Sequence, residues 1–258
     1  MARRDRFDLA GRNALVTGGG SGLGKAMAFG LAEHGANVAI LDIDPDTASS
    51  VAHEIEGMGM SSLALPGDVV EEADAWNAVS AVVDAWGSLD VLINNAGIAI
   101  IGPAEEMSVA DFRRVHEVDL LGPFIFCKAA FPPMSRQGRG SIINVASMAG
   151  LSVLAPQEYV GYNSAKAAVI MLTKSLAVEW VGHGIRVNAL APGYMLTPPV
   201  LALKREDPQL WDSWMSRVPM GRGGDPDELK GVAVYLASDA SSFMTGSVLV
   251  VDGGYTSM

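Results

Sequence analysis

The stretch Thr17-Gly18-Gly19-Gly20-Ser21-Gly22-Leu23-Gly24 decides the fold of this chain. It lies between an apolar run, Asn13–Thr17, and a pattern typical of a helix. Glycines at this spacing let the backbone turn sharply and approach a phosphate group, and the first turn of the following helix offers free N–H groups. The lysine and hydroxyl residue that end a P-loop are absent, because Lys25 precedes an alanine. We therefore predict a dinucleotide-binding loop, in which the cofactor contacts are made by Gly18, Ser21, Gly22, Leu23 and Gly24.

The rest of the chain alternates short apolar runs with longer helical patterns. The segments between the runs are long enough for crossover helices, and repeated strand–helix–strand units predict a parallel sheet. We expect an α/β fold in which residues 1–258 form a single doubly wound (Rossmann) domain, with about seven strands and helices on both faces. The runs that predict strands are Asn13–Thr17, Asn37–Leu41, Ser62–Leu65, Val91–Asn94, Ser141–Val145, Ile185–Leu190 and Ser247–Val251.

Residues 193–224 are the one long stretch outside this rhythm. The stretch is bounded by Pro198-Pro199 and Gly223-Gly224, and it contains Trp211 and Trp214. So long an excursion from a compact domain is usually a lid or a binding element. We expect a mobile substrate lid with exposed tryptophans, and the alternative is a pair of surface helices that pack locally.

Composition limits the classes of function. The chain has a net charge of −11, which argues against nucleic acid or an anionic membrane as the main partner. The single cysteine, Cys127, cannot form an internal disulfide, which fits a reducing compartment. No apolar run approaches the roughly 20 residues that cross a bilayer, and the four histidines are too dispersed to suggest a metal site. We expect a cytoplasmic protein with a small-molecule substrate.

Asp42 ends the second predicted strand, where an acid accepts hydrogen bonds from the hydroxyls of an adenosine ribose. A 2′-phosphate would meet the carboxylate there, at a cost of about 4 kcal/mol for a separation of ~4 Å and an effective dielectric constant of ~20. No arginine in the loop or just after Asp42 offsets this repulsion. The sequence therefore favours NAD over NADP. The alternative is that Asp42 or Asp44 caps the next helix, for which Asp44 is better placed.

Tyr162 and Lys166 lie one helical turn apart on the same face of a predicted helix, and Ser147 follows the strand that ends at Val145. A Tyr-x-x-x-Lys pair alone is common by chance. Together with the glycine loop, Asn94-Asn95-Ala96-Gly97 and Pro192-Gly193 with Thr197, the pair makes the sequence resemble the short-chain dehydrogenase/reductase family. The resemblance runs from about Phe7 to Tyr255, nearly the whole chain.

The resemblance assigns roles to particular side chains. It implies that Tyr162 exchanges a proton with the substrate oxygen, that Lys166 holds the nicotinamide ribose and assists Tyr162, and that Ser147 orients the substrate. It also implies a homotetramer, which apolar helices over residues 108–134 and 162–180 would suit. The implied cofactor contacts are Asp68 and Val69 beside adenine; Asn95, Ala96 and Gly97 behind the adenosine ribose; and Pro192, Gly193 and Thr197 around the carboxamide. Asn94 is expected to stabilise the sheet instead.

One position departs from the family pattern. The family usually has asparagine in a Val-Asn-Leu context, and this chain has Val118-Asp119-Leu120. In the family, the main chain of that residue helps to hold a water that leads to the catalytic lysine. Asp119 adds a negative charge near Lys166, which is expected to raise the lysine pKa and to alter proton transfer. We therefore group Asp119 with the catalytic residues and expect activity to persist.

The substrate is the least determined feature. The interval Ala155–Tyr159 and the C-terminal region resemble the sugar, polyol and sugar-acid dehydrogenases of the family, and the substrate contacts expected are Ser147, Gln157, Tyr159, Tyr194 and Trp211. The apolar character of residues 193–224 keeps open a 3-oxoacyl-acyl-carrier-protein reductase or a hydrophobic-alcohol dehydrogenase, against which Asp42 and the net charge argue. A sensor or scaffold that binds NAD without turnover is the remaining alternative.

Overall fold

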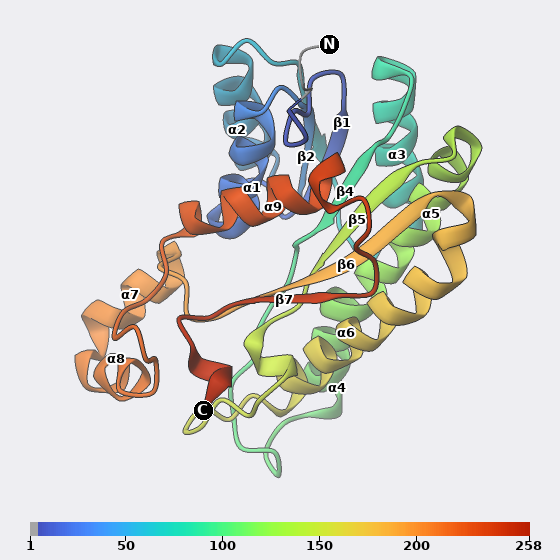
Figure 1. Cartoon of the computed structure of the whole chain (residues 1–258). Coiled ribbons are helices and arrows are strands. Elements are labelled where there is room, and N and C mark those ends of the chain that lie inside the picture. The colour runs from blue at the N-terminus through green and yellow to red at the C-terminus, as the bar shows by residue number, and fades with distance from the viewer. Residues whose placement is uncertain (1–4) are drawn as a thin grey trace.

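The computed structural model describes residues 5–258 and contains a seven-stranded sheet (Figure 1). The strand order is β3-β2-β1-β4-β5-β6-β7, and every neighbouring pair is parallel. The seven predicted strands are confirmed, with ends that differ by no more than two residues. Their bounds are β1 Asn13–Thr17, β2 Asn37–Asp42, β3 Ser62–Pro66, β4 Val91–Asn94, β5 Gly140–Val145, β6 Ile185–Pro192 and β7 Val248–Val251.

Helices cover both faces of the sheet, as expected for a doubly wound domain (Figure 1). One face carries α1 (Gly22–Glu33), α2 (Pro45–Gly57) and α9 (Lys230–Ala237). The other carries α3 (Glu72–Trp86), α5 (Gly122–Gln137) and α6 (Val160–Trp180), with α4 (Val109–His116) packed against α6. The last pair, α7 (Pro198–Glu206) and α8 (Pro208–Met215), follows β6 and lies away from the sheet.

Several helices begin at side chains that satisfy their free N–H groups. Asp44 caps α2 by accepting from the N–H of Asp46 at 3.0 Å, and Ser108 caps α4 by accepting from the N–H of Asp111. Asp225 and Glu228 form a reciprocal capping box before α9. Asp44, rather than Asp42, is therefore the cap of α2.

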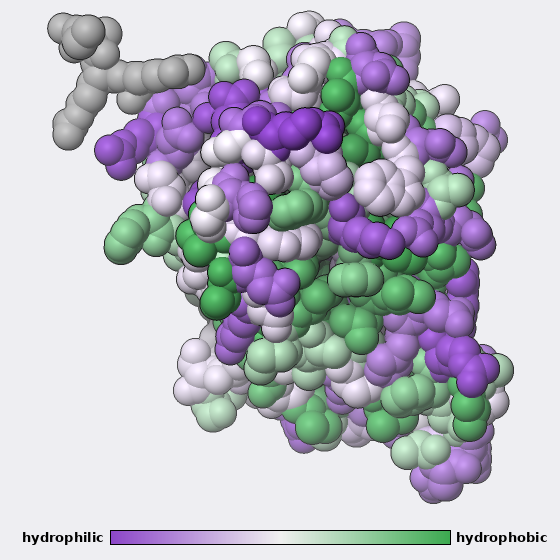
Figure 2. All heavy atoms as spheres, turned by 90° about the vertical axis from the view of Figure 1, so that its right-hand side faces the viewer, coloured by the Kyte–Doolittle hydropathy of each residue, from purple (hydrophilic) through white to green (hydrophobic). Residues whose placement is uncertain are grey.

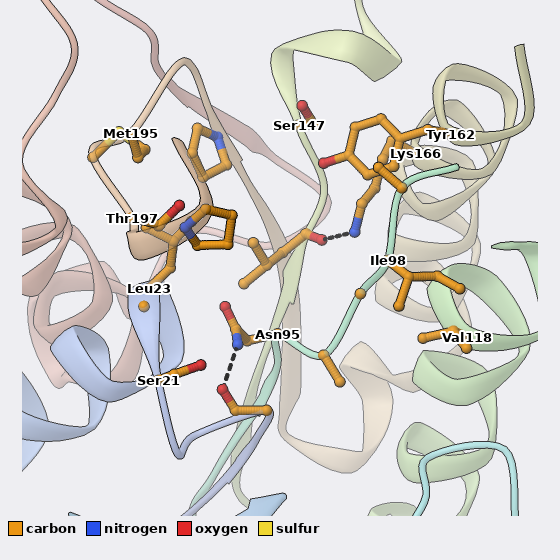
Figure 3. A pocket seen from close by; sticks show the side chains of 18 of the residues that line it. Ser21, Leu23, Asn95, Ile98, Val118, Ser147, Tyr162, Lys166, Met195 and Thr197 are labelled. Atoms are coloured by element: carbon orange, nitrogen blue, oxygen red, sulfur yellow. Dashed lines mark hydrogen bonds between the residues drawn. The ribbon is translucent and has the colours of Figure 1, made fainter. Parts of the chain in front are cut away.

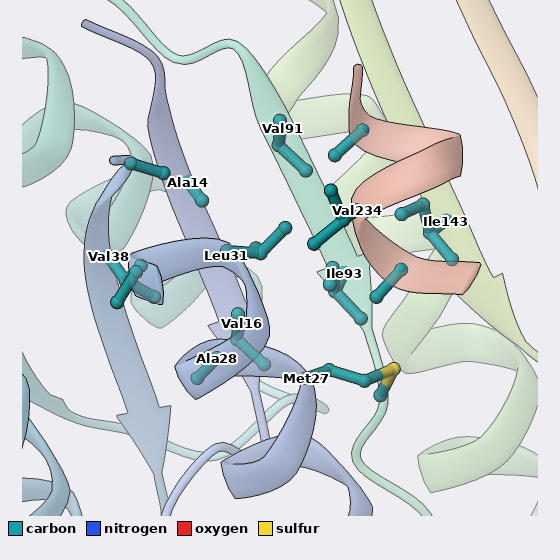
Figure 4. Close-up of a cluster of buried hydrophobic side chains, with 14 of the residues drawn as sticks. Ala14, Val16, Met27, Ala28, Leu31, Val38, Val91, Ile93, Ile143 and Val234 are labelled. Atoms are coloured by element: carbon teal, nitrogen blue, oxygen red, sulfur yellow. The ribbon is translucent and has the colours of Figure 1, made fainter. Parts of the chain in front are cut away.

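The core consists of two apolar layers, one on each face of the sheet. Figure 4 shows part of the first, in which Val16 and Val38 of the strands meet Leu31 of α1 and Val234 of α9. Each fully buried side chain of this size stabilises the fold by roughly 1.5–3 kcal/mol. The layers fix the strands, and hence the sheet edge at which their carboxyl ends meet.

A chain of buried polar side chains joins the centre of the sheet to α6. The amide of Asn94 on β4 donates to Asn144 on β5 at 2.8 Å, and the amide of Asn144 donates to Thr173 on α6 at 2.9 Å. The expectation that Asn94 stabilises the sheet is confirmed. Because Tyr162 and Lys166 also belong to α6, these bonds help to fix the helix that carries both residues.

The surface over α5 and α6 is rich in apolar side chains (Figure 2). Phe124 of α5 and Met171 and Val178 of α6 are exposed, although each is large and apolar. The expected homotetramer would bury such groups. The tetramer stays a prediction, and light scattering tests it by measuring the mass of the protein in solution. Within residues 5–258, no helix combines the length and the apolar character needed to cross a membrane.

Candidate active site

A cavity of about 740 Å³ lies at the carboxyl ends of the central strands. It is lined by Gly18 after β1, Asp42 at the end of β2, Asn95 after β4, Ala146 after β5 and Pro192 at the end of β6. From β1 the sheet is extended on one side by β2 and β3 and on the other side by β4 to β7. The direction in which strands are added therefore reverses between β1 and β4. Such a switch point is where parallel α/β sheets bind their ligands.

The glycine loop is shaped to receive a diphosphate. Gly18 and Gly22 have φ angles of +60° and +52°, and a Cβ atom on Gly18 would lie 2.9 Å from the Cα of Ala96. Helix α1 begins after Ser21 without a side-chain cap and without an acidic residue in its first turn, unlike α2. Its free N–H groups and positive dipole end therefore remain available to an anion.

Asn95 holds the loop in place. Its side-chain amide donates to the carbonyls of Thr17 and Gly18, at 3.1 and 3.0 Å (Figure 3). Its main-chain N–H donates to the hydroxyl of Thr17 at 3.0 Å. Asn95 therefore fixes the loop to the end of β4, and its neighbours Ala96 and Gly97 line the cavity beside it.

Asp42 faces the glycine loop from the end of β2. Its carboxylate accepts from the N–H of Gly20 at 2.9 Å and from the N–H of Asp44 at 3.2 Å. It also lines the cavity, as do Asp68 and Val69. Arg114 of α4, which the sequence reasoning missed, lines the same region and lies 3.6 Å from the Asp68 carboxylate. The loop and these acids fit the diphosphate and the adenosine of a dinucleotide.

Ser147, Tyr162 and Lys166 lie together at the other end of the cavity (Figure 3). The Ser147 oxygen accepts from the N–H of Ala149 at 3.1 Å, which leaves its own hydrogen free to donate. The Lys166 ammonium donates to the carbonyl of Val145 at 3.0 Å and lies 5.5 Å from the centre of the Tyr162 ring. The structure therefore brings together the three residues that the sequence separated by up to 19 positions.

The structure corrects two of the expected substrate contacts. Tyr159 and Tyr194 line the cavity, whereas Gln157 and Trp211 do not, and Trp214 lines it instead. In the orientation that satisfies its neighbours, the Gln157 amide accepts from the Tyr194 hydroxyl at 2.7 Å and donates to the carbonyl of Leu154 at 2.8 Å. Gln157 is therefore occupied in fixing the wall of the cavity.

Residues 193–224 form part of that wall. Their tryptophans were expected to be exposed, but both are buried. Trp211 and Trp214 are 6% and 5% exposed, and the Trp214 ring stacks on Tyr194 with a centroid distance of 4.6 Å. Pro198 and Val200 extend the wall from α7, which has no buried residue of its own. The opening and closing of this lid stay a prediction, which hydrogen exchange with and without cofactor checks.

The remaining predicted cofactor residues also have definite positions. Ser21, Gly22, Leu23, Pro192, Gly193 and Thr197 line the cavity. Gly24 does not line it, because it packs against the carbonyl of Gly18, where a side chain would collide. No sequence signal pointed to the apolar lining residue Leu154, which lies in a loop. Met195 and Val200 also line the cavity, and both belong to the stretch 193–224 that was expected to form an apolar lid.

Comparison with known proteins agrees with this geometry. A family model described as enoyl-(acyl carrier protein) reductase matches residues 18–256. Galactitol 2-dehydrogenase (L-tagatose-forming) from Cereibacter sphaeroides is 40% identical over 99% of both chains. A short-chain type dehydrogenase/reductase from Mycobacterium marinum has a TM-score of 0.92 at 40% identity, over 98% of both chains. A putative NAD(P)-dependent gluconate 5-dehydrogenase from Beutenbergia cavernae, solved with bound NADP, has a TM-score of 0.91 at 40% identity, over 98% of this chain and all of that one.

The fold and the site define a dinucleotide-dependent oxidoreductase. The chain belongs to the short-chain dehydrogenase/reductase family, and it acts on the CH–OH group of secondary alcohols with a nicotinamide cofactor. The resemblance drawn from its motifs is thereby confirmed.

The close approach of Gly18 to Ala96 gives a direct test of the loop. The change Gly18→Ala is expected to lower the free energy of unfolding by at least about 1–2 kcal/mol, because alanine disfavours the left-handed conformation and its methyl meets Ala96. It should also weaken NADH binding. Urea unfolding and fluorescence titration measure both effects.

Gly57→Ala is the matched control, since a Cβ there meets nothing within 4 Å and its φ is not positive. It is expected to leave NADH binding unchanged and to stabilise the fold by up to ~1 kcal/mol. Equal effects of the two variants on binding would contradict the role given to Gly18.

Proposed function

We propose that this chain is an NAD-dependent dehydrogenase that interconverts a secondary hydroxyl of a neutral polyol and the corresponding ketone. The observation that carries the proposal is the placement of Ser147, Tyr162 and Lys166 at one end of a cavity whose other end is the uncapped glycine loop. A dinucleotide bound along this cavity would have its diphosphate at the loop and its nicotinamide beside Tyr162. The same placement serves oxidation and reduction.

The roles of the side chains follow from their contacts. When bound, the nicotinamide supplies or takes up the hydride. In the direction of oxidation, the oxygen of Tyr162 takes the proton of the substrate hydroxyl, and in reduction it returns the proton. The free hydrogen of Ser147 donates to the substrate oxygen and orients it. The Lys166 ammonium, next to the Tyr162 ring, stabilises the negative charge that Tyr162 carries when it acts as a base.

The charges that line the cavity support NAD as the cofactor. The described cations that line it are Arg114 and Lys166, and each already has a counter-charge, Asp68 at 3.6 Å and Asp119 at 3.1 Å. A 2′-phosphate near Asp42 would therefore meet a carboxylate without an uncommitted cation. The relative from Beutenbergia cavernae was solved with NADP bound at low occupancy, so the preference for NAD is proposed from the side chains of the present chain alone.

The same balance of charge supports a neutral substrate. A sugar acid would bring a carboxylate to the end of the cavity where Lys166 is already paired. The hydroxyls of Ser147, Tyr159 and Tyr194 can instead bind the hydroxyls of a polyol. Burial raises the pKa of both Tyr159 and Tyr194, so both stay protonated. The Tyr159 hydroxyl can donate to the substrate, whereas the Tyr194 hydroxyl, which donates to Gln157, can accept from it. The similarity to a galactitol dehydrogenase points to the same class of substrate.

A hydrophobic alcohol or an oxoacyl substrate is the second candidate. The wall formed by Leu154, Val200 and Trp214 favours it, because these side chains present apolar surface to the substrate. The Tyr159 hydroxyl favours the polyol, since an apolar substrate would give it no hydrogen-bond partner. A sensor that binds NAD without turnover would make no use of Ser147 and Tyr162.

The assignment of Tyr162 is tested by removing one oxygen atom. Tyr162→Phe is expected to lower kcat for polyol oxidation by a factor of about 10²–10⁴, because the proton acceptor is lost. NADH binding, measured by fluorescence titration, should change by no more than about twofold. Tyr159→Phe is the matched control: it removes a hydroxyl from the same cavity and should mainly raise KM. Similar kcat values for wild type and Tyr162→Phe would refute the acid/base role.

Cofactor choice is tested by calorimetric titration of NADH and NADPH. The wild type is expected to bind NADH at least about tenfold more tightly, a difference of ~1.4 kcal/mol. Asp42→Ala should narrow the difference, because it removes both the ribose acceptor and the repulsive charge. The control is Asp44→Ala, which removes the cap of α2 but leaves the cavity charge. Comparable affinities of the wild type for the two cofactors would exclude NAD specificity.

A further inference from the structure

Asp119 occupies an unusual place in the backbone. It lies in a π-helical turn, Glu117–Leu121, that joins α4 to α5, and its side chain is fully buried. Single π-helical turns are rare and occur often at functional sites. This turn directs Asp119 toward the catalytic end of the cavity, where a Cβ on Gly97 would lie 3.1 Å from its Oδ2 and 3.3 Å from the Lys166 Nζ.

The two oxygens of Asp119 have different partners. Oδ1 accepts from the main-chain N–H of Ile98 at 2.8 Å, which holds the carboxylate in position. Oδ2 lies 3.1 Å from the Nζ of Lys166 and has no hydrogen-bond partner among the described residues besides this ion pair. Lys166 is itself only 4% exposed. The pair is therefore withdrawn from solvent and is not screened as a surface ion pair would be.

A lysine buried in this way would lose its proton readily if no counter-charge were present. Burial acts most strongly on Lys166 and lowers its pKa, while Asp119 and Tyr162 raise it, so that the pKa ends above its ordinary value. The other groups described near its ammonium are the carbonyl of Val145 on β5, at 3.0 Å, and the Tyr162 ring, whose centre lies at 5.5 Å. Asp119 is thus the acid that faces Lys166.

We propose that Asp119 is a positioning residue whose carboxylate keeps the Lys166 ammonium charged and fixed before any cofactor binds. An ammonium has three hydrogens. One is donated to Val145 at 3.0 Å, and the ammonium lies 3.1 Å from Asp119, so a further hydrogen is left for a cofactor hydroxyl or for Tyr162. This proposal rests on the proposed function, because it concerns the same lysine. Its consequence is that Lys166 retains its charge, and the enzyme its activity, into alkaline solution.

Asp119→Asn isolates the charge. The asparagine has nearly the same shape and its oxygen can still accept from Ile98, but it carries no negative charge. The Lys166 pKa is then expected to fall, because burial is no longer opposed by Asp119. In pH profiles of kcat/KM for alcohol oxidation, the alkaline limb should move to lower pH by about one unit or more. NADH affinity should also fall about tenfold between neutral and alkaline pH in the variant, but not in the wild type.

A readout on the ligand-free protein does not depend on turnover. With lysine labelled at Cε by carbon-13, NMR follows each lysine through its titration, and the signal missing from Lys166→Met identifies Lys166. The titration midpoint of that signal should be lower in Asp119→Asn than in the wild type by about one pH unit or more. An unchanged midpoint would overturn the proposal. A lowered midpoint in a protein that oxidises no alcohol would support the ion pair and reject the proposed function.

Asp90→Asn is the matched control. Asp90 is also a buried acid, but it pairs with Arg12 at 3.5 Å and Arg139 at 2.7 Å, near the start of β4 and away from the cavity. Its loss should destabilise the fold without changing the Lys166 midpoint.

If Asp119→Asn does not fold, the double variant Asp119→Asn with Lys166→Met tests whether an unpaired lysine charge is the cause, because it removes both charges of the pair. Recovery of folded protein would support the pairing, and failure to recover it would contradict it.

Discussion

The parallel pairing of β1 with both β2 and β4 is the constraint on which the rest of this protein depends. Parallel strands end at the same edge of a sheet, and the chain leaves β1 and β4 in opposite directions, so a crevice opens between the loops that follow them. The bonds from Asn95 to Thr17 and Gly18 close the floor of that crevice. The phosphate loop and the catalytic end consequently share one cavity, although they lie more than a hundred residues apart in the sequence.

Balance of charge within the cavity then determines what it can accept. Among residues 5–258, Asp42 has no ion-pair partner, whereas Arg114 and Lys166 each lie beside an acid. The Lys166–Asp119 pair is buried, and an ammonium whose charge is balanced by an adjacent carboxylate attracts a further anion less strongly. The cavity is thus suited to a ligand whose own negative charge lies at the diphosphate, where α1 provides free N–H groups.

Local patterns allowed much of the fold and site to be predicted. The apolar runs gave all seven strands, and the spacing of four between Tyr162 and Lys166 placed both on one helix face, since a helix repeats every 3.6 residues. The cap Asp44 was found because capping depends on contacts within three residues. The wall of the cavity was not predictable in the same way. Trp211 and Trp214 differ by three positions on α8, and only the packing of Tyr194 decides which of them faces the cavity.

The sequence by itself determined which segments form strands and helices, the glycine loop, the acid at the end of β2 and the family to which the chain belongs. Each of these depends on the spacing of residues that are close together in the chain. The tertiary structure decided which polar groups are free. Gln157 is hydrogen-bonded to Tyr194 and Leu154. Arg114 forms an ion pair with Asp68, and Asp119 forms one with Lys166. Hydrogen bonds and ion pairs between residues far apart in the chain depend on how the elements pack, and burial removes the water that would otherwise satisfy each group.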